Sequence, residues 1–332
     1  MSTPQTKDWS ANNVPDQTGK LAVVTGGNSG IGYEAVLILA GKGAHVILAV
    51  RSAEKGKTAV EAIKRIYPKA AGEVMALDLS DLSSVRGFAD AFRQRFAALP
   101  LLINNAGVMA LPYKRTADGF EMQFGTNHLG HFALTGLLMP AILAAPNARV
   151  VMVSSGAHVP GVIDFENLDG KIKYGRWQAY CQSKLANLLF AYELQRRSVA
   201  AGASAIAVGC HPGFAATNLQ TAGPRMVGSR FNEQVSTLGN RLFAQSAAMG
   251  ALPTLFAATA PEVNGCDYIG PLGLMGMRGA PGKVKSSARS YDAAVAAQLW
   301  QVSEDLTKVS FEGLAAARNA TAAGIGQLAL SA

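Results

Sequence analysis

The chain has 332 residues, 49% of them hydrophobic, and a formal net charge of +8. This length and hydrophobic content exclude a disordered chain and support a sizeable core, in one large α/β domain or two small ones. The charge suits an anionic cofactor as well as a nucleic acid. However, the basic residues are scattered, only 7% of residues are aromatic and no recognised nucleic-acid-binding module occurs, so we expect no nucleic-acid partner.

Cysteine usage and the N-terminal residues together predict a cytoplasmic protein. The three cysteines, Cys181, Cys210 and Cys266, are odd in number and far apart, which indicates neither a disulfide framework nor a zinc site. Residues Met1–Gly19 are polar and contain prolines, unlike a signal peptide. Glycine, charge or proline interrupts every long apolar stretch, so no integral membrane segment is expected.

The first predicted elements form a candidate phosphate-binding unit. Strand Leu21–Thr25 is followed by Gly-Gly-Asn-Ser-Gly-Ile-Gly, helix Tyr33–Ala40 and strand Ala44–Val50. In such a turn, glycines let the backbone approach a phosphate, and the helix N-terminus attracts the anion. A tight turn that binds nothing is the alternative. The predicted cofactor contacts in the turn are Gly26, Asn28, Ser29, Gly30, Ile31 and Gly32.

The end of the second strand indicates which dinucleotide is bound. An Asp or Glu at this place would bond a ribose 2′-hydroxyl, but the sequence has Arg51, with Lys55 one turn on. A guanidinium can pair with a 2′-phosphate in bidentate fashion, so NADP(H) is favoured over NAD. The alternative is that Arg51 is only a solvated surface charge.

Strands and helices continue to alternate along the chain. The next elements are predicted as helix Ala53–Tyr67, strand Glu73–Leu77, helix Asp81–Ala98 and strand Leu101–Ile103. This alternation predicts an α/β fold with a single Rossmann-type, doubly wound parallel sheet of about seven strands, flanked by helices. Ligands are expected at the carboxyl ends of the strands. Asp78 lies at one such end and could meet an adenine amino group, although capping the following helix is an equally good explanation. Its neighbour Leu79 is also a predicted cofactor contact.

The fourth strand ends in small and amide residues that would let a cofactor ribose lie close. These predicted contacts are Asn105, Ala106 and Gly107. A plain turn is an equally good explanation.

Asn127 lies in a largely helical segment, Phe120–Met139, and is a candidate site residue. His128 and His131 lie beside it, but no third ligand has suitable spacing. Packing or surface roles are therefore expected for these histidines, and no metal site is predicted.

The fifth strand and the following helix supply the candidate reactive groups. Strand Arg149–Val153 is followed by Ser155, whose hydroxyl could bond a substrate oxygen or simply terminate the strand. Tyr180 and Lys184 are four residues apart in the predicted helix Ala179–Arg197, so they lie on one helix face. The pair places a proton donor beside a positive charge, although this spacing alone also arises by chance.

The sixth strand, Ala205–Val208, is followed by Pro212 and Gly213, which we expect beside the cofactor. Thr217 could bond a carboxamide such as that of nicotinamide. Residues 214–244 are loop-like and carry scattered apolar side chains. They suit a lid over an apolar substrate, and an ordinary packed loop is the alternative.

The last predicted helices are Gln245–Thr259 and Asp292–Glu304. No internal repeat or Ser/Pro-rich linker occurs, so residues 19–310 are expected to form one domain. Residues 1–18 form an N-terminal extension and residues 311–332 an Ala-rich C-terminal tail.

Taken together, these stretches resemble the classical short-chain dehydrogenases/reductases. The resemblance runs from about Gly19 to Gly270, and its parts share the order and approximate spacing of that family. They are Thr25-Gly26-x-x-x-Gly30-x-Gly32, Asn104-Asn105-Ala106-Gly107, Asn127, Ser155, Tyr180-x-x-x-Lys184 and Pro212-Gly213. Ala-Tyr-Cys-Gln-Ser-Lys-Leu-Ala-Asn and the long serine-to-tyrosine interval are most similar to the retinol-dehydrogenase-like and protochlorophyllide-reductase-like branch.

The resemblance implies a role for each candidate residue. Tyr180 would be the general acid or base, and Lys184 would hold the nicotinamide ribose and lower the pKa of Tyr180. Ser155 would orient the substrate carbonyl, and Asn127 would support a proton-relay water. Free tyrosine titrates near pH ~10, and a nearby cation stabilises the phenolate.

These expectations combine into one functional hypothesis. The chain would be an NADP(H)-dependent enzyme that interconverts a small apolar aldehyde or ketone and its alcohol. The alternatives are an NADPH-dependent carbon–carbon double-bond reductase and a non-catalytic NADP-binding redox sensor. A homo-oligomer is compatible with the family, but the sequence does not indicate one.

Overall fold

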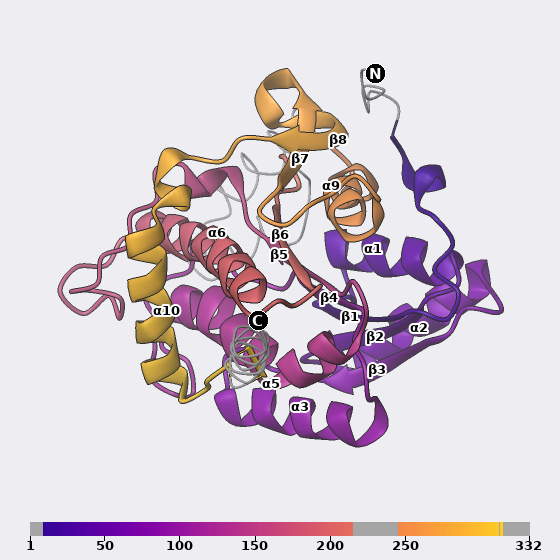
Figure 1. Cartoon of the computed structure of the whole chain (residues 1–332), viewed down its shortest axis with the longest axis horizontal. Helices are drawn as coiled ribbons and strands as arrows, with labels where there is room; N and C mark the ends of the chain where they lie inside the picture. The colour runs from indigo at the N-terminus through magenta and orange to yellow at the C-terminus, as the bar shows by residue number, and fades with distance from the viewer. Residues whose placement is uncertain (1–8, 215–244, 312, 315–332) are drawn as a thin grey trace, which may run out of the picture.

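Eight strands form one sheet in the part of the chain that the computed structural model describes, residues 9–214, 245–311 and 313–314 (Figure 1). The strand order is β3-β2-β1-β4-β5-β6-β7-β8. Neighbouring strands are parallel from β3 to β7, and β8 is antiparallel to β7. The bounds are β1 Leu21–Thr25, β2 His45–Val50, β3 Gly72–Ala76, β4 Leu101–Asn104, β5 Arg149–Val153, β6 Ile206–Cys210, β7 Tyr268–Gly273 and β8 Arg278–Val284.

The strand order reverses direction at the middle of the sheet. In β1, Val23 pairs with Ile47 of β2 on one side and with Leu102 of β4 on the other. The chain therefore builds one half of the sheet outward from β1 and then returns to build the other half from β4. In open sheets of this kind, ligands bind outside the carboxyl ends of the strands at the reversal point.

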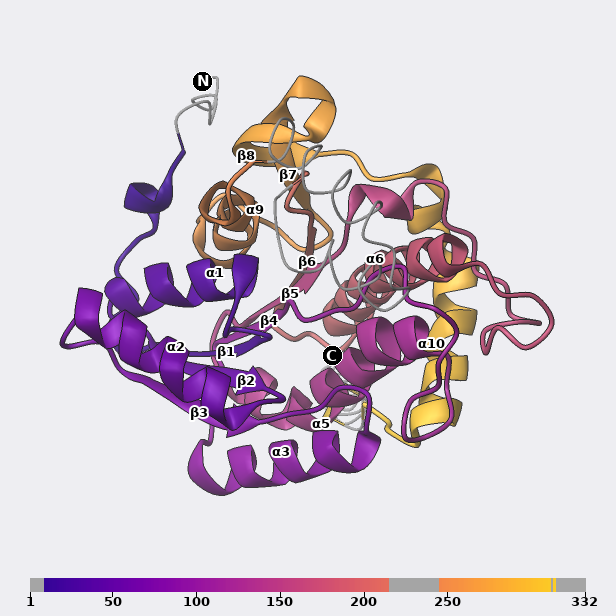
Figure 2. The ribbon, with the colours of Figure 1, turned by 180° about the vertical axis from the view of Figure 1, so that it is seen from behind.

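Helices cover both faces of the sheet, as Figures 1 and 2 show from opposite sides. Helices α1, α2 and α9 pack on one face and α3, α5 and α6 on the other, while α10 lies against α6. The bounds are α1 Gly30–Gly41, α2 Ala53–Ile66, α3 Leu82–Arg95, α5 Gly130–Ala144, α6 Arg176–Ala200, α9 Ala247–Thr259 and α10 Ala293–Thr307. Because successive strand side chains point to opposite faces, Val23 and Val24 belong to different core clusters.

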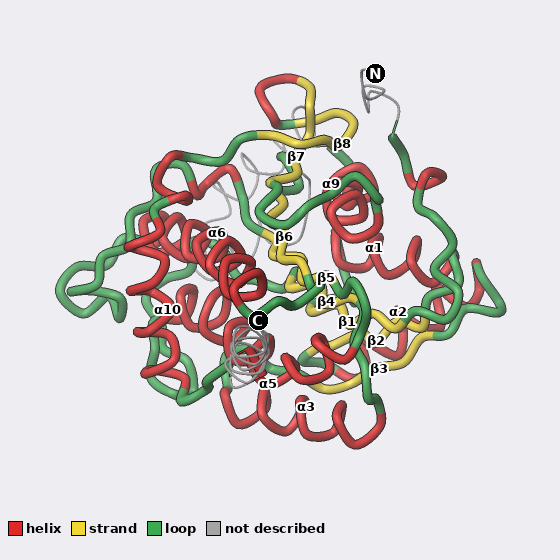
Figure 3. Tube along the Cα trace, viewed as in Figure 1, coloured by secondary structure: helices red, strands yellow, loops and turns green. Residues whose placement is uncertain are grey.

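The predicted doubly wound sheet is confirmed, and an eighth, antiparallel strand adds to it. Strand β8 has the sequence Arg-Gly-Ala-Pro-Gly-Lys-Val, which carries no strand signal, since proline and glycine are depleted in strands. It forms because β7 supplies a partner across a short turn at η4 (Leu274–Gly276), and an edge strand tolerates proline. Figure 3 shows this hairpin as two strands joined by a helical turn.

The predicted helical segment Phe120–Met139 is divided into three parts. A single helical turn, α4 (Met122–Phe124), leads into a π-helical turn, η2 (Gly125–Leu129), and then into α5. A π turn inserts an extra residue into the winding, and such turns often occur at functional sites. This one contains Asn127.

Both terminal segments contribute to the core where they are described. Trp9 of the N-terminal extension packs edge-on against Phe256 of α9, with ring centroids 5.2 Å apart. Phe311 and Leu314, at the start of the Ala-rich tail, are buried in the main core cluster. These hydrophobic residues therefore tie the ends of the described chain to the sheet's helical layers.

Candidate active site

The predicted site residues gather at one edge of the sheet. Gly26 follows β1, Asn105 follows β4, Ser155 follows β5 and Pro212 closely follows β6. These four strands are parallel neighbours, so their carboxyl ends lie side by side. The fold thus brings together residues that are up to 186 positions apart, as the span from Gly26 to Pro212 shows.

The glycine turn and the end of β4 form one interlocked unit. Thr25 Oγ1 accepts hydrogen bonds of 2.9 Å from the N–H groups of Asn105 and Ala106, and Asn105 Nδ2 donates to Thr25 O at 2.8 Å. Gly26 has a φ of +67°, a conformation that side chains other than glycine rarely adopt. A Cβ at Gly32 would lie 2.5 Å from Asn105 Nδ2. Glycine is therefore required at these two positions for packing and conformation.

The rest of the turn leads directly into α1. Gly30 has a φ of +55° and begins the helix after Ser29, whose side chain makes no capping hydrogen bond. The first turn contains no acidic residue. Its backbone N–H groups and positive dipole end therefore suit an anion; Asn28 and Ser29 directly precede this turn, and Ile31 lies in it. The glycine turn and the N-terminus of α1 together fit a dinucleotide pyrophosphate.

Arg51 is exposed immediately after β2, beside the glycine turn on the adjacent strand. Ser52 then caps α2, accepting the N–H of Lys55. The described structure places no carboxylate directly at the end of β2, since Val50 and Arg51 occupy that point. A cation is thus available where a 2′-phosphate would approach.

Asp78 and Leu79 have structural roles at the end of β3. Asp78 Oδ1 accepts hydrogen bonds from the Ser80 N–H at 2.9 Å and the Ser80 hydroxyl at 2.6 Å. The helix cap of α3 is Asp81, so the capping alternative for Asp78 is wrong. Leu79 is buried, and a Cβ at Gly130 would lie 2.4 Å from its carbonyl oxygen.

Asn127 connects the end of β4 to α6. Its Oδ1 accepts the Val108 N–H at 2.8 Å, while its Nδ2 donates to Val108 O and to Ser183 Oγ, both at 2.9 Å. A Cβ at Gly107 would lie 3.1 Å from Asn127 Oδ1 and 3.6 Å from Lys184 Nζ. Small size at Gly107 therefore keeps open the space between these two side chains.

His131 is a site residue that the sequence analysis missed. Its Nδ1 lies 2.9 Å from Asn127 O and its Nε2 2.9 Å from Thr25 Oγ1. A carbonyl oxygen can only accept, so the hydrogen is on Nδ1 and Nε2 accepts the Thr25 hydroxyl. Burial lowers the pKa of His131 to about 4, so the ring is neutral at physiological pH. His131 thus ties Asn127 to the glycine turn.

Ser155 and Tyr180 meet at the end of β5. The Ser155 side chain lies near enough to the Tyr180 hydroxyl to affect its pKa, and Ser155 Oγ accepts the Ala157 N–H at 3.2 Å. Tyr180 is buried in α6. Burial raises the pKa of Tyr180 to about 12, although the neighbouring Ser155 side chain opposes the rise. The phenol is consequently protonated at neutral pH.

Lys184 lies one helical turn beyond Tyr180 and is almost fully buried. Its Nζ donates to Val153 O at 3.1 Å, and it lies 5.8 Å from the centroid of the Tyr180 ring. Burial lowers the pKa of Lys184 to about 8. Burial is the largest influence on the pKa of Tyr180, and the Lys184 ammonium is directed to the Val153 carbonyl.

The loop after β6 begins at the same edge. Gly213 has a φ of +67°, and a Cβ there would lie 2.4 Å from Met277 O of the hairpin. Pro212 O accepts a hydrogen bond of 2.6 Å from Gln245 Nε2. Thr217 and almost all of the predicted lid at 214–244 lie outside the described residues.

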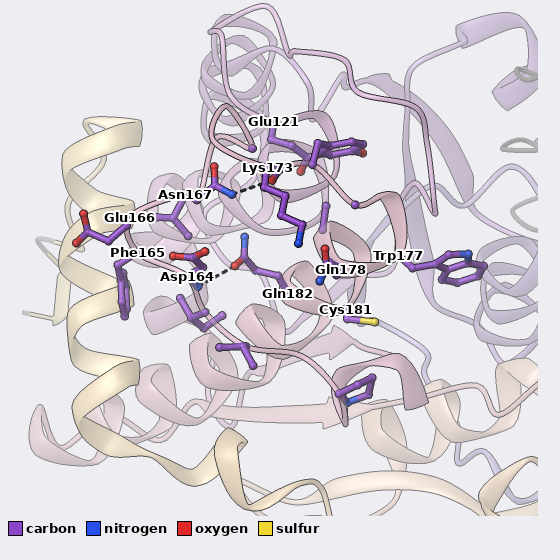
Figure 4. A pocket seen from close by; sticks show the side chains of 18 of the residues that line it. Glu121, Asp164, Phe165, Glu166, Asn167, Lys173, Trp177, Gln178, Cys181 and Gln182 are labelled. Carbon is purple, nitrogen blue, oxygen red and sulfur yellow. Dashed lines mark hydrogen bonds between the residues drawn. The ribbon is translucent and has the colours of Figure 1, made fainter.

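A separate pocket of about 820 Å³ adjoins the other side of α6. Its lining includes Trp177, Gln178, Cys181 and Gln182 of α6, together with residues of the preceding loop such as Asp164 (Figure 4). Gln182 Oε1 accepts the Asp164 N–H at 2.9 Å, which fixes the loop to the helix. The Trp177 ring packs edge-on against Tyr180, with centroids 6.1 Å apart.

Two further findings concern metals and membranes. Among residues 9–214 and 245–311, no group of three His, Cys, Asp or Glu side chains could hold a metal ion. His128 is fully buried, with Nε2 2.8 Å from Ser303 Oγ and its ring beside Phe124, so it has the expected packing role.

Within the described part of the chain, no helix has the length and apolar character needed to cross a membrane.

Comparison with known proteins places the chain in a family. The family model described as short chain dehydrogenase matches residues 20–226. Polyprenol dehydrogenase of Danio rerio is 38% identical over 303 residues, 90% of this chain and 89% of that protein. Retinol dehydrogenase 13 of Homo sapiens is 43% identical over 248 residues, 74% of this chain and 73% of that protein.

A solved structure supports the same assignment. The crystal structure of an uncharacterised protein from Mycobacterium paratuberculosis is 44% identical and has a TM-score of 0.76, covering 91% of this chain and 98% of that one. The interlocked glycine turn and the Ser155–Tyr180–Lys184 arrangement thus occur in a chain that aligns with these proteins over most of its length. The chain belongs to the short-chain dehydrogenases/reductases, in their retinol-dehydrogenase-like branch.

Proposed function

We propose that this protein is an NADP(H)-dependent oxidoreductase that interconverts an apolar aldehyde or ketone and its alcohol. The observation that carries the proposal is the buried Tyr180, which lies beside Ser155 and Lys184 at the carboxyl end of β5. A neutral phenol in this place can donate its proton to a carbonyl oxygen, and the phenolate can take it back.

The chain's own residues divide the remaining work. Ser155 orients the carbonyl oxygen by a hydrogen bond, because its side chain lies beside the Tyr180 hydroxyl. Lys184 supplies a fixed positive charge beside Tyr180. Asn127 links the segment after β4 to α6 through its hydrogen bond to Ser183. When bound, NADP(H) supplies or accepts the hydride.

The cofactor would occupy the edge of the sheet described above. The residues that would hold it are Gly26, Asn28, Ser29, Gly30, Ile31, Gly32, Arg51, Asp78, Leu79, Asn105, Ala106, Gly107, Tyr180, Lys184, Pro212, Gly213 and Thr217. The exposed Arg51 after β2 supports NADP(H) over NAD, because its guanidinium can pair with a 2′-phosphate.

The names of the relatives support an apolar substrate. Polyprenol and retinol, in the names of the aligned dehydrogenases, are both apolar alcohols. An enzyme that reduces a carbon–carbon double bond would use the same tyrosine as a proton donor, so turnover of an enone and of a simple ketone should be compared. A redox sensor would bind NADPH without turning over either.

Purified protein, NADPH and a panel of apolar aldehydes and ketones provide the test. We expect Tyr180→Phe to reduce kcat about 10²- to 10⁴-fold, since it removes only the hydroxyl that transfers the proton. Tyr67→Phe, at the end of α2 and away from the carboxyl ends of the strands, is the matched control and should retain wild-type turnover. Equal activity of wild type and Tyr180→Phe on every substrate would refute the proposal.

A further inference from the structure

The turn that follows Ser155 contacts a segment much later in the chain. Residues 155–161 include the short helical turn η3 (Gly156–His158), and residues 286–291 include η5 (Ala288–Tyr291). We call residues 286–291 the C-terminal clamp. Neither the resemblance nor the proposed reaction assigns it a role.

His158 joins Ser155 to the C-terminal clamp through both nitrogens of its ring. His158 Nδ1 lies 2.6 Å from Ser155 O, and the Ser287 N–H donates to His158 Nε2 at 3.0 Å. A carbonyl only accepts and a backbone N–H only donates, so one neutral tautomer satisfies both contacts. The ring is 3% exposed, and burial lowers its pKa, so this neutral form is stable.

The C-terminal clamp also contacts α6 and the turn at residues 155–161. Ser286 Oγ lies 2.9 Å from the Tyr192 hydroxyl of α6, and the rings of Tyr192 and Tyr291 stack with centroids 5.1 Å apart. Arg289 Nη1 donates to Gly161 O at 3.2 Å. Because α6 also carries Tyr180, the C-terminal clamp contacts both the turn that follows Ser155 and the helix that carries Tyr180. It therefore fixes the position of one relative to the other.

We propose that His158 is a positioning residue for Ser155. By bonding the Ser155 carbonyl and the Ser287 amide together, it fixes the turn so that the Ser155 hydroxyl faces Tyr180. The position of Ser155 Oγ depends on the conformation of this turn, because Oγ accepts the Ala157 N–H within the turn. This inference rests on the proposed function, since it concerns the alignment of the same serine and tyrosine.

Two substitutions each retain one of the two bonds. In His158→Asn the amide can replace Nδ1 near Ser155, and in His158→Gln it can replace Nε2 near Ser287. We expect both to lower kcat about 10- to 100-fold with little change in KM or NADPH affinity, because misalignment of a reacting group costs this much. Ser287→Ala is the control: it keeps the N–H and removes only an Oγ that has no hydrogen-bond partner. It should behave as wild type.

A double-mutant cycle separates positioning from general destabilisation. If His158 acts through Ser155, His158→Gln should have no further effect on kcat in a Ser155→Ala background. Additive losses would overturn the proposal, as would wild-type kcat in both His158 variants. Should the wild type reduce no carbonyl on the panel, the proposed function fails instead.

Amide hydrogen exchange at Ala157 then decides the positioning role without turnover. We expect its protection to be lost in His158→Asn and His158→Gln and kept in Ser287→Ala. Unchanged protection in the His158 variants would refute the role of His158.

Discussion

Replacing Lys184 with methionine should stabilise the cofactor-free protein while abolishing its activity. Lys184 is 3% exposed, and burial lowers its pKa from the ordinary 10.5 to about 8. The difference between these pKa values means that keeping the ammonium charged costs the fold about 3 kcal/mol at pH 7. Methionine has a similar unbranched shape and carries no charge to desolvate.

One favourable contact is lost in the same variant. Lys184 Nζ donates to Val153 O, a bond worth about 1 kcal/mol. The Val153 carbonyl keeps a second donor, Asn187 Nδ2 at 3.3 Å, so it is not left unsatisfied. We therefore expect Lys184→Met to raise the free energy of unfolding by about 2 kcal/mol at pH 7.

The pH dependence gives the decisive measurement. Below pH 8 Lys184 is charged in both the folded and the unfolded chain, so its destabilising effect is fully present. Between 8 and 10.5 the folded form is neutral and the unfolded form charged, so the stability of the wild type rises relative to the variant. Urea unfolding of both proteins should show the advantage of Lys184→Met shrinking to near zero at about pH 9.5.

The control for this experiment is Lys57→Met on α2. Lys57 is exposed, so its substitution should change the free energy of unfolding by less than about 0.5 kcal/mol at either pH. A Lys184→Met protein less stable than wild type at pH 7, or an advantage that is the same at both pH values, would refute the reasoning.

Three further substitutions test other parts of the structure. Arg51→Ala should raise KM for NADPH far more than KM for NADH, and equal effects in steady-state kinetics would contradict the proposed contact between Arg51 and a 2′-phosphate. Gly130→Ala should lower the thermal midpoint, because its Cβ would lie 2.4 Å from Leu79 O, and an unchanged midpoint would show that the backbone yields. Trp300→Ala, in a cluster of edge-on and tilted aromatic rings in the core, should cost about 3–5 kcal/mol in urea unfolding, against less than about 1 kcal/mol for substitution of the half-exposed Trp177 by alanine.

The features that the sequence predicted well depend on local signals. The alternation of elements predicted the doubly wound sheet, and the edge of that sheet brings the glycine turn, Asn105, Ser155 and Pro212 together. The predicted helix Asp81–Ala98 corresponds to α3 (Leu82–Arg95). Each of these depends on residues a few positions apart, so a single sequence contains the information.

The features that it did not predict depend on distant partners. Strand β8 forms only because β7 lies beside it, and its own composition opposes a strand. His131 and His158 had no motif to identify them, since their roles come from contacts with Thr25 and Ser287, 106 and 129 positions away. A histidine's function depends on what each ring nitrogen faces, which the fold decides.

The pair Tyr180 and Lys184 shows where spacing stops being informative. A separation of four residues places both side chains on one face of α6, and they do lie together. Spacing does not say where the ammonium points, and here it donates to the Val153 carbonyl within the low-dielectric interior. Burial therefore acts on both groups by disfavouring charge, raising the pKa of Tyr180 to about 12 and lowering that of Lys184 to about 8. The cofactor-free site consequently holds its proton on the phenol, which is the state that a carbonyl oxygen requires of a proton donor.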